Sequence, residues 1–223
     1  MTQPTDQTTT TPTGPQALPL LNEPAPGFRA RTTHGERALA DYRGRWLVFF
    51  AHPADFTPVC ASEFIAFSQA YDRFQALGCD LLGLSVDSLF AHIAWLRSIE
   101  TQFGVRVPFP IVEDPSMVIA RAYGMLHPGA HTSATVRASF VIDPAGIIRA
   151  ITWYPMTVGR SVEELLRLVT ALQTSDREQV FTPEGWLPGG AVLMPPPILM
   201  PGMPFAPALE PGDWYYRLGA IDG

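Results

Sequence analysis

The segment from residue 46 to residue 86 constrains the fold of this chain more than any other. Two apolar runs, WLVFF at 46–50 and DLLGLSV at 80–86, have the length and composition of buried strands. Between them, large apolar residues recur on one helical face: Phe64, Phe67, Tyr71, Phe74 and Leu77. Gly78 is a natural end for that helix. A strand, a helix of roughly five turns and a second strand form a βαβ unit, so the sequence predicts parallel strands.

The remaining patterns predict that the sheet is mixed. Two short extended segments within 28–38 flank the turn sequence THGE, and 109–112 suits a short strand. Residues 138–142 and 147–153 predict a hairpin joined by the turn sequence DPAG. Helices are predicted after Ser88, over 116–123, and after a capping box formed by Ser161 and Glu164. We therefore expect an α/β thioredoxin-like fold with a central mixed β-sheet flanked by helices.

The composition changes near both ends of the chain. Residues 1–17 are mostly Thr, Pro and Gln, which predicts a disordered N-terminal tail. Residues 18–175 would form the folded domain. Residues 176–223 are rich in proline but also carry aromatic side chains, so we expect an extended C-terminal arm that packs on another surface.

A cysteine lies where the first predicted strand meets the helix. Thr57 suits the N-cap, Pro58 suits the first helical position, and Cys60 then falls in the first turn. Unpaired N–H groups and the helix dipole favour a thiolate there, and we expect the Thr57 hydroxyl to reach the Cys60 N–H beside the sulfur. A lone cysteine in an apolar chain is more often an inert packing residue. Its place at a capped helix start makes Cys60 a candidate nucleophile.

The order of Pro53, Thr57 and Cys60 is the P-x-x-x-T-x-x-C signature of the peroxiredoxins. The string HPADFTPVC resembles the one-cysteine, peroxiredoxin-6-type branch of this alkyl hydroperoxide reductase and thiol-specific antioxidant superfamily. Further matches run from about residue 20 to residue 215 and include SVDS at 85–88, RASFVIDPAG at 137–146 and the last predicted helix. The arm segment LMPPPILMPGMPF is longer and richer in methionine than the usual pattern.

This resemblance implies the main catalytic roles. Cys60 would attack the peroxide, Thr57 would position sulfur and peroxide, and backbone N–H groups near Val59 and Cys60 would bind peroxide oxygen. Pro53 would shield the sulfur from solvent, although taken alone it could be merely a loop proline that interrupts regular secondary structure. Arg137 would hold thiolate and peroxide, whereas an isolated arginine before a strand is usually a surface charge.

Three further residues are implied as supporting groups. Glu63 and Arg160 would hold the site arginine in place, or could be ordinary charges near helix starts. His52 could influence the thiolate, donate a hydrogen bond to peroxide, or form a packed wall. His127 and His131 have the spacing of helical metal ligands, but the Pro-Gly pair between them disfavours a helix, so neither a metal nor a cofactor is expected.

The predicted function is a thiol-dependent peroxidase that reduces hydrogen peroxide and organic hydroperoxides through a sulfenic acid. Cys79, at the start of a buried strand, is expected to pack, and the arm has no cysteine. An external thiol such as a thioredoxin-like protein, glutathione or a small thiol would therefore recycle Cys60. The alternative is a peroxide sensor or chaperone-like oligomer that uses the same cysteine. The arm implies a homodimer or a higher ring of dimers.

Charge and composition restrict other partners. The net charge of -6 disfavours nucleic acid and anionic membranes. The chain has no lysine, which excludes a lysine nucleophile. No apolar run approaches the ~20 residues that span a membrane. The N-terminus lacks the charge and apolar core of a signal peptide, so the expected location is cytoplasmic.

Overall fold

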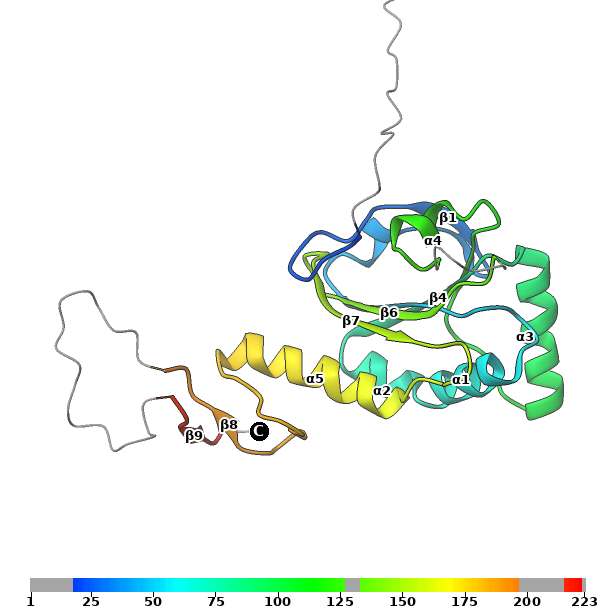
Figure 1. Cartoon of the computed structure of the whole chain (residues 1–223). Coiled ribbons are helices and arrows are strands. Elements are labelled where there is room, and N and C mark those ends of the chain that lie inside the picture. Colours follow the sequence, from blue (N-terminus) through cyan, green and yellow to red (C-terminus); the bar gives the residue numbers. More distant parts are fainter. Residues whose placement is uncertain (1–17, 127–132, 197–214, 222–223) are drawn as a thin grey trace, which may run out of the picture.

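A computed structural model describes residues 18–126, 133–196 and 215–221. A seven-stranded mixed sheet has the order β2-β1-β5-β4-β3-β6-β7, with helices on both faces, as the sequence predicts (Figure 1). Its strands are β1 (Arg29–Thr32), β2 (Gly35–Ala38), β3 (Trp46–Ala51), β4 (Cys79–Ser85), β5 (Ile111–Glu113), β6 (Arg137–Ile142) and β7 (Ile148–Tyr154). The helices are η1 (Leu39–Tyr42), α1 (Pro58–Gln69), α2 (Tyr71–Ala76), α3 (Leu89–Phe103), α4 (Val118–Ala122) and α5 (Val162–Glu178).

Strand β3 lies inside the sheet and leads directly to the helix that carries Cys60. It pairs in parallel with β4 and antiparallel with β6, so both of its edges are hydrogen-bonded. Val48 and Phe50 enter one core cluster, whereas Leu47 and Phe49 enter the other. Because side chains alternate between the faces of a strand, an uninterrupted apolar run is what a strand with two covered faces requires.

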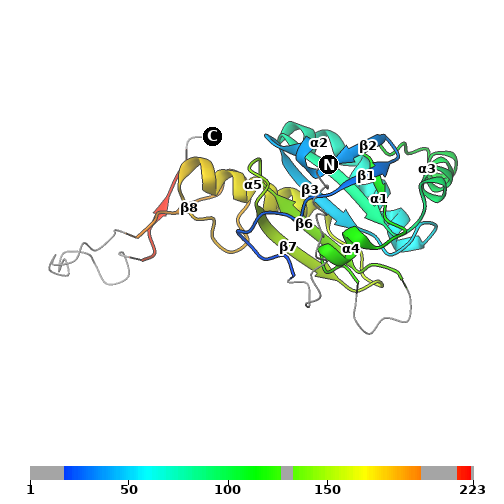
Figure 2. The ribbon, with the colours of Figure 1, turned by 90° about the horizontal axis from the view of Figure 1, so that it is seen from above.

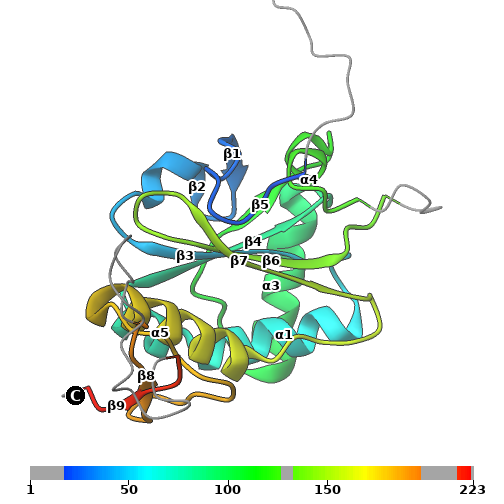
Figure 3. The ribbon, with the colours of Figure 1, turned by 60° about the vertical axis from the view of Figure 1, so that its left-hand side comes forward.

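The two faces of the sheet are covered by different helices. One core contains side chains of α1, α2, α3 and α5, including Phe64, Phe74, Trp95 and Leu165. The other contains side chains of η1 and α4, including Tyr123 just after α4. Figure 3 shows α1, α3 and α5 together on one side of the sheet, and Figure 2 shows the molecule from above, with α3 at the end of the sheet away from α5.

The helix predicted after Cys60 is interrupted. Ala70, at φ -92° and ψ 0°, ends α1 and begins α2, and its carbonyl accepts the N–H of Arg73 at 3.0 Å. The bend does not disturb the predicted apolar face, because Phe64, Phe67 and Phe74 are all buried in the same cluster. Gly78 follows at φ 61°, a left-handed conformation that glycine adopts without strain, and the chain enters β4.

The caps of the later helices are partly as predicted. Ser88 caps α3 and accepts the N–H of Ala91 at 3.3 Å. Ser161 accepts the N–H of Glu164 at 3.1 Å, but the Glu164 carboxylate binds Arg167. The capping box is therefore only half formed, because a nearby guanidinium on the next turn attracts the carboxylate more strongly than a neutral N–H does.

The last helix and the segment after it pack together. Helix α5 runs to Glu178, past the composition change at residue 175. Ala171 packs with Val180, Trp186 and Val192 in a small apolar cluster, and β8 (Val192–Leu193) pairs with β9 (Leu218–Gly219). Within the described ranges, no helix combines the length and apolarity that crossing a membrane requires.

Candidate active site

Cys60 lies in the first turn of α1, as predicted, and its side chain is fully buried. Pro58 and Val59 are the first two helical residues, so the N–H groups of Val59 and Cys60 precede the first position that can bond within the helix. The Ala61 N–H is the first to do so and donates to Thr57 O at 3.0 Å. The sulfur therefore lies at the positive end of the α1 dipole.

The expectation for the Thr57 hydroxyl is wrong. Thr57 is the N-cap residue, but its Oγ1 donates to Ala54 O at 2.8 Å and makes no capping bond to the helix. The reason is the path of the loop: Phe56 has φ 56°, and this left-handed residue turns the chain so that Ala54 O faces the hydroxyl. A hydroxyl that donates its proton in this way keeps its lone pairs for another donor.

Strand β6 brings Arg137 to the sulfur. Arg137 opens this strand, is 2% exposed, and directs Nη1 at Cys60 Sγ across 3.3 Å. Its Nε and Nη2 both donate to Met156 O, at 3.0 and 2.7 Å. The guanidinium is therefore fixed on two sides, and one of its edges faces the sulfur. The prediction that Arg137 lies beside Cys60 agrees with this geometry.

Glu63 joins Arg137 to Arg160. Its Oε2 accepts Arg137 Nη1 at 2.7 Å and Arg160 Nη2 at 2.8 Å, and its Oε1 accepts the backbone N–H and Nε of Arg160 at 2.8 and 2.9 Å. Burial alone would raise the pKa of Glu63, but the hydrogen bonds and charge of Arg160, with the charge of Arg137, hold it below its ordinary value. Glu63 is therefore an anion.

Arg160 is anchored as firmly as the carboxylate that it binds. Its Nη1 donates to Ala138 O at 3.0 Å and to Ser139 Oγ at 3.2 Å, both on β6. The guanidinium also lies 5.0 Å from the Phe50 ring centroid. Arg160 is therefore held against two neighbouring strands of the sheet, β6 and β3.

His52 and Pro53 are buried in the loop between β3 and α1. The His52 ring stacks on Trp95 at 5.2 Å and meets Phe64 edge-on at 4.8 Å. Its Nε2 lies 2.8 Å from Asp55 Oδ1, and its Nδ1 has no hydrogen-bond partner among the described residues. This geometry matches the packed-wall interpretation. The ring nitrogen that has a partner, Nε2, binds Asp55 and not the Cys60 sulfur.

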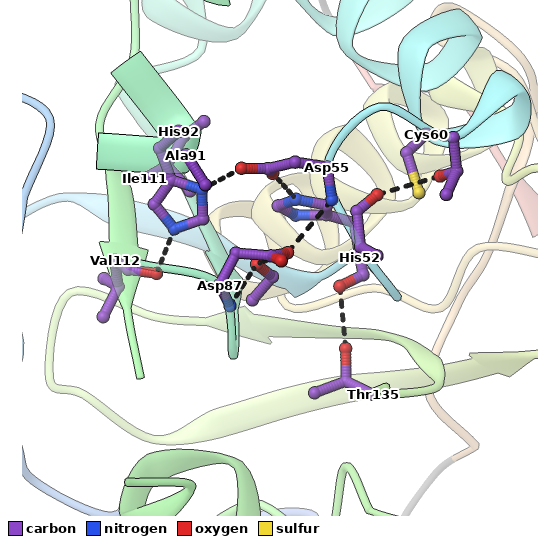
Figure 4. A network of polar contacts seen from close by, with 12 residues as sticks. His52, Asp55, Cys60, Asp87, Ala91, His92, Ile111, Val112 and Thr135 are labelled. Atoms are coloured by element: carbon purple, nitrogen blue, oxygen red, sulfur yellow. Dashed lines mark hydrogen bonds and ion pairs between the residues drawn. The ribbon is translucent and has the colours of Figure 1, made fainter. Parts of the chain in front are cut away.

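Sequence reasoning missed a second group of polar residues next to this loop. Asp55 accepts from His52 and, through Oδ2, from His92 Nδ1 at 2.8 Å, while its backbone N–H donates to Asp87 (Figure 4). Asp55 is inside the HPADFTPVC motif, but His92 lies 37 residues further on. The signal that the sequence offered for this polar group was the Asp55 carboxylate, which lies inside the motif. His127 and His131 lie outside the described residues.

Cys79 lies far from the sulfur of Cys60. It pairs with Trp46, the first residue of β3, whereas Cys60 follows the end of that strand. Six residues of parallel strand separate the two ends by roughly 17 Å. Burial, followed by the Asp80 charge, raises the pKa of the Cys79 thiol to about 12, so it is protonated at neutral pH.

Comparison with protein families explains this arrangement. Residues 21–151 match the AhpC/TSA family, and residues 171–198 match the C-terminal domain of 1-Cys peroxiredoxin. The chain belongs to the AhpC/TSA family. Its second match identifies the 1-Cys peroxiredoxin branch, which is the resemblance expected from the Cys60 motif.

Similar proteins and structures agree with this membership. A peroxiredoxin of Aquifex aeolicus is 50% identical over 192 residues, covering 81% of this chain and 86% of the relative. The yeast mitochondrial 1-Cys peroxiredoxin has a TM-score of 0.75 and 40% identity, with 79% of this chain and 87% of the other covered. A peroxiredoxin 6 mutant of Arenicola marina has a TM-score of 0.79 and 31% identity over 90% of this chain and 97% of the other. These neighbours share the thioredoxin-like peroxiredoxin fold.

Proposed function

We propose that Cys60 is the peroxide-reducing sulfur of this thiol-dependent peroxidase. The observation that carries the proposal is the 3.3 Å contact between Arg137 Nη1 and Cys60 Sγ at the start of α1. A guanidinium and a helix terminus both favour negative charge on the sulfur. The only other cysteine, Cys79, is a buried thiol whose raised pKa makes it a poor nucleophile.

In the proposed reaction, the Cys60 thiolate attacks one oxygen of the peroxide. The S–O bond forms as the O–O bond breaks, and the electron pair leaves on the distal oxygen, which takes a proton to become water or an alcohol. The sulfur is oxidised to a sulfenic acid. Two thiols then reduce it: the first displaces water to form a mixed disulfide, and the second releases the Cys60 thiol and a disulfide.

Each neighbouring residue has a proposed role in this step. Thr57 Oγ1 can accept the peroxide O–H because its own proton is donated to Ala54 O. The N–H groups of Val59 and Cys60, with Arg137, would stabilise charge on the peroxide oxygens. Pro53 would limit solvent access, since it lies buried in the preceding loop.

The supporting residues act through Arg137. Glu63 accepts hydrogen bonds from both arginines and so fixes the Arg137 guanidinium that faces Cys60. Arg160 fixes Glu63 in turn with three hydrogen bonds. His52 would close the loop as an aromatic wall against Trp95 and Phe64. No cofactor enters this cycle, because the sulfur supplies both electrons.

An external thiol is the proposed reductant. A disulfide requires Cα atoms about 4.4–6.8 Å apart, so Cys79 cannot reach Cys60 across the length of β3. In the yeast mitochondrial 1-Cys peroxiredoxin, thiol resolution proceeds via glutathione and thioredoxin systems. We propose that a small thiol or a thioredoxin-like protein plays the same part here, in the cytoplasm.

A homodimer or a higher ring of dimers is the proposed assembly. The arm exposes large apolar side chains at Leu187, Tyr216 and Leu218, with exposed fractions of 63%, 54% and 62%. Covering such residues favours association. Light scattering coupled to size-exclusion chromatography tests this, and a monomer at micromolar concentration would refute it.

The product of the reaction tests the proposed function. Reduced protein is treated with one equivalent of hydrogen peroxide and weighed by mass spectrometry, beside Cys60→Ser and Cys79→Ser. We expect one added oxygen in wild type and Cys79→Ser, and none in Cys60→Ser. A disulfide between Cys60 and Cys79 would contradict the one-cysteine mechanism, and oxygen added to Cys60→Ser would contradict the assignment of the nucleophile.

A further inference from the structure

Asp55 connects the loop that precedes Cys60 to two other parts of the fold, helix α3 and the segment between β4 and α3. Its carboxylate accepts His52 Nε2 and His92 Nδ1, each at 2.8 Å, and its backbone N–H donates to Asp87 Oδ2 at 3.0 Å. His92 belongs to α3, and its Nε2 lies 3.3 Å from Val112 O on β5. Figure 4 shows the carboxylate between the two imidazole rings.

The directions of these hydrogen bonds follow from the charge on Asp55. Burial would raise the pKa of Asp55, but the hydrogen bonds from His52 and His92 lower it below its ordinary value, so the group is a carboxylate that can only accept. Both imidazoles must therefore donate. The side chains of Asp55 and the two histidines are 2%, 0% and 0% exposed, so no solvent competes for these bonds.

The loop needs such an anchor because its next residue is strained. Phe56 has φ 56°, a conformation that costs energy for any residue with a Cβ. Its side chain is 61% exposed, so packing does not hold it in place. The fixed points lie on either side: Asp55 before it, and the Thr57 hydroxyl bonded to Ala54 O after it. Thr57 then begins the helix turn that carries Cys60.

We propose that Asp55 and His92 are positioning residues for the peroxide reaction, because they fix Thr57 and the Cys60 helix turn against α3 and β5. This inference rests on the proposed function of Cys60. His52, Asp55 and His92 each offer one side-chain nitrogen or oxygen atom, and these atoms lie within 4.8 Å of one another, a spacing that could also bind a metal ion. The hydrogen bonds at 2.8 Å already satisfy the carboxylate without an ion.

The experiment compares His92→Leu, which removes the donor, with His92→Asn, whose side-chain N–H also extends from the γ carbon. His34→Leu makes the same change in the turn between β1 and β2 and is the matched control. Two rate constants are measured for each protein: oxidation of Cys60 by hydrogen peroxide, and its alkylation by iodoacetamide. Alkylation requires the thiolate but not the alignment of peroxide with Thr57 and Arg137. Melting curves establish that each variant is folded.

We expect His92→Leu to slow the peroxide reaction about tenfold or more while alkylation changes less than about threefold, since small displacements are enough to lose this much rate. His92→Asn should recover most of the loss, and His34→Leu should match wild type. If His92→Leu does not fold, Asp55→Asn takes its place with the same expected ratio.

Several results would overturn the inference. If His92→Leu lowers both rate constants equally, the network affects the thiolate or the fold rather than the alignment of peroxide. If it lowers neither rate constant, His92 has no positioning role. A stoichiometric metal in the purified protein would replace the hydrogen-bond network with a metal site. A wild-type rate no higher than that of free cysteine would instead refute the proposed function, and the positioning role with it.

Discussion

Replacing Glu63 with glutamine should damage both stability and the peroxide reaction. Glu63 is 2% exposed and accepts hydrogen bonds from two arginines with both carboxylate oxygens. A glutamine oxygen at the Oε1 position keeps the two bonds from Arg160 N and Nε. The amide NH₂ then meets Arg137 Nη1 and Arg160 Nη2, which are donors like itself.

The size of the loss follows from these contacts. Two hydrogen bonds between charged groups disappear, each worth about 1.5–3 kcal/mol. Removing one partner of a buried ion pair costs about 3–5 kcal/mol for the same reason. We therefore expect the free energy of unfolding to fall by about 4 kcal/mol. Because Arg137 loses a fixed partner beside Cys60, the peroxide rate constant should also fall by about tenfold or more.

Urea unfolding with linear extrapolation measures the first quantity, and stopped-flow mixing with peroxide measures the second. Glu163→Gln is the control, since Glu163 pairs with Arg73 on the surface with 71% of its side chain exposed, and solvent screens that pair. A loss of less than about 1 kcal/mol for Glu63→Gln, as for an exposed pair, together with an unchanged rate, would refute this reasoning.

Four further predictions concern Thr57, the pH dependence of Glu63 and of His52, and Cys79. Thr57→Val removes the bond to Ala54 O and the acceptor offered to peroxide, so the peroxide rate should fall at least about tenfold while Thr57→Ser stays close to wild type. Because the pKa of Glu63 is lowered on folding, its stabilising contribution is complete above the ordinary carboxyl range and is lost as pH falls through the folded value. The urea midpoints of wild type and Glu63→Gln should therefore converge in acid; parallel curves would contradict this. Burial lowers the pKa of His52, so the unfolded chain alone gains that proton below 6.5, and wild-type stability should already decline there. Cys79, with its pKa raised to about 12, should resist iodoacetamide in the folded protein at pH 8, and fast labelling would show that it is accessible.

Much of the fold could be predicted because it depends on local pattern. The run at 46–50 had to be a strand with two covered faces, and β3 places alternate residues in two separate cores. The bend at Ala70 could not be predicted in this way, because alanine has the highest helix propensity and nothing in its neighbours marks a break. There the tertiary packing of α1 and α2 overrides local preference.

The residues of the site likewise divide into those whose place follows from local sequence and those whose place depends on tertiary structure. The first-turn position of Cys60 follows from Thr57 and Pro58, which lie just before it in the sequence. The partners of Glu63 lie 74 and 97 residues away, and only a family resemblance could connect them. The direction of the Thr57 hydroxyl was predicted wrongly, since it depends on the backbone of Phe56 rather than on residue type. The pairing of Asp55 with His92 was missed because it joins a loop to a different helix.

The central claim is that the fold assembles Cys60, and not Cys79, for reaction with peroxide. The most direct test is the second-order rate constant for hydrogen peroxide, measured by stopped flow on reduced wild type, Cys60→Ser and Cys79→Ser. We predict a wild-type rate constant far above that of free cysteine, retained in Cys79→Ser and lost in Cys60→Ser. A wild-type rate equal to that of free cysteine, or a loss confined to Cys79→Ser, would contradict the claim.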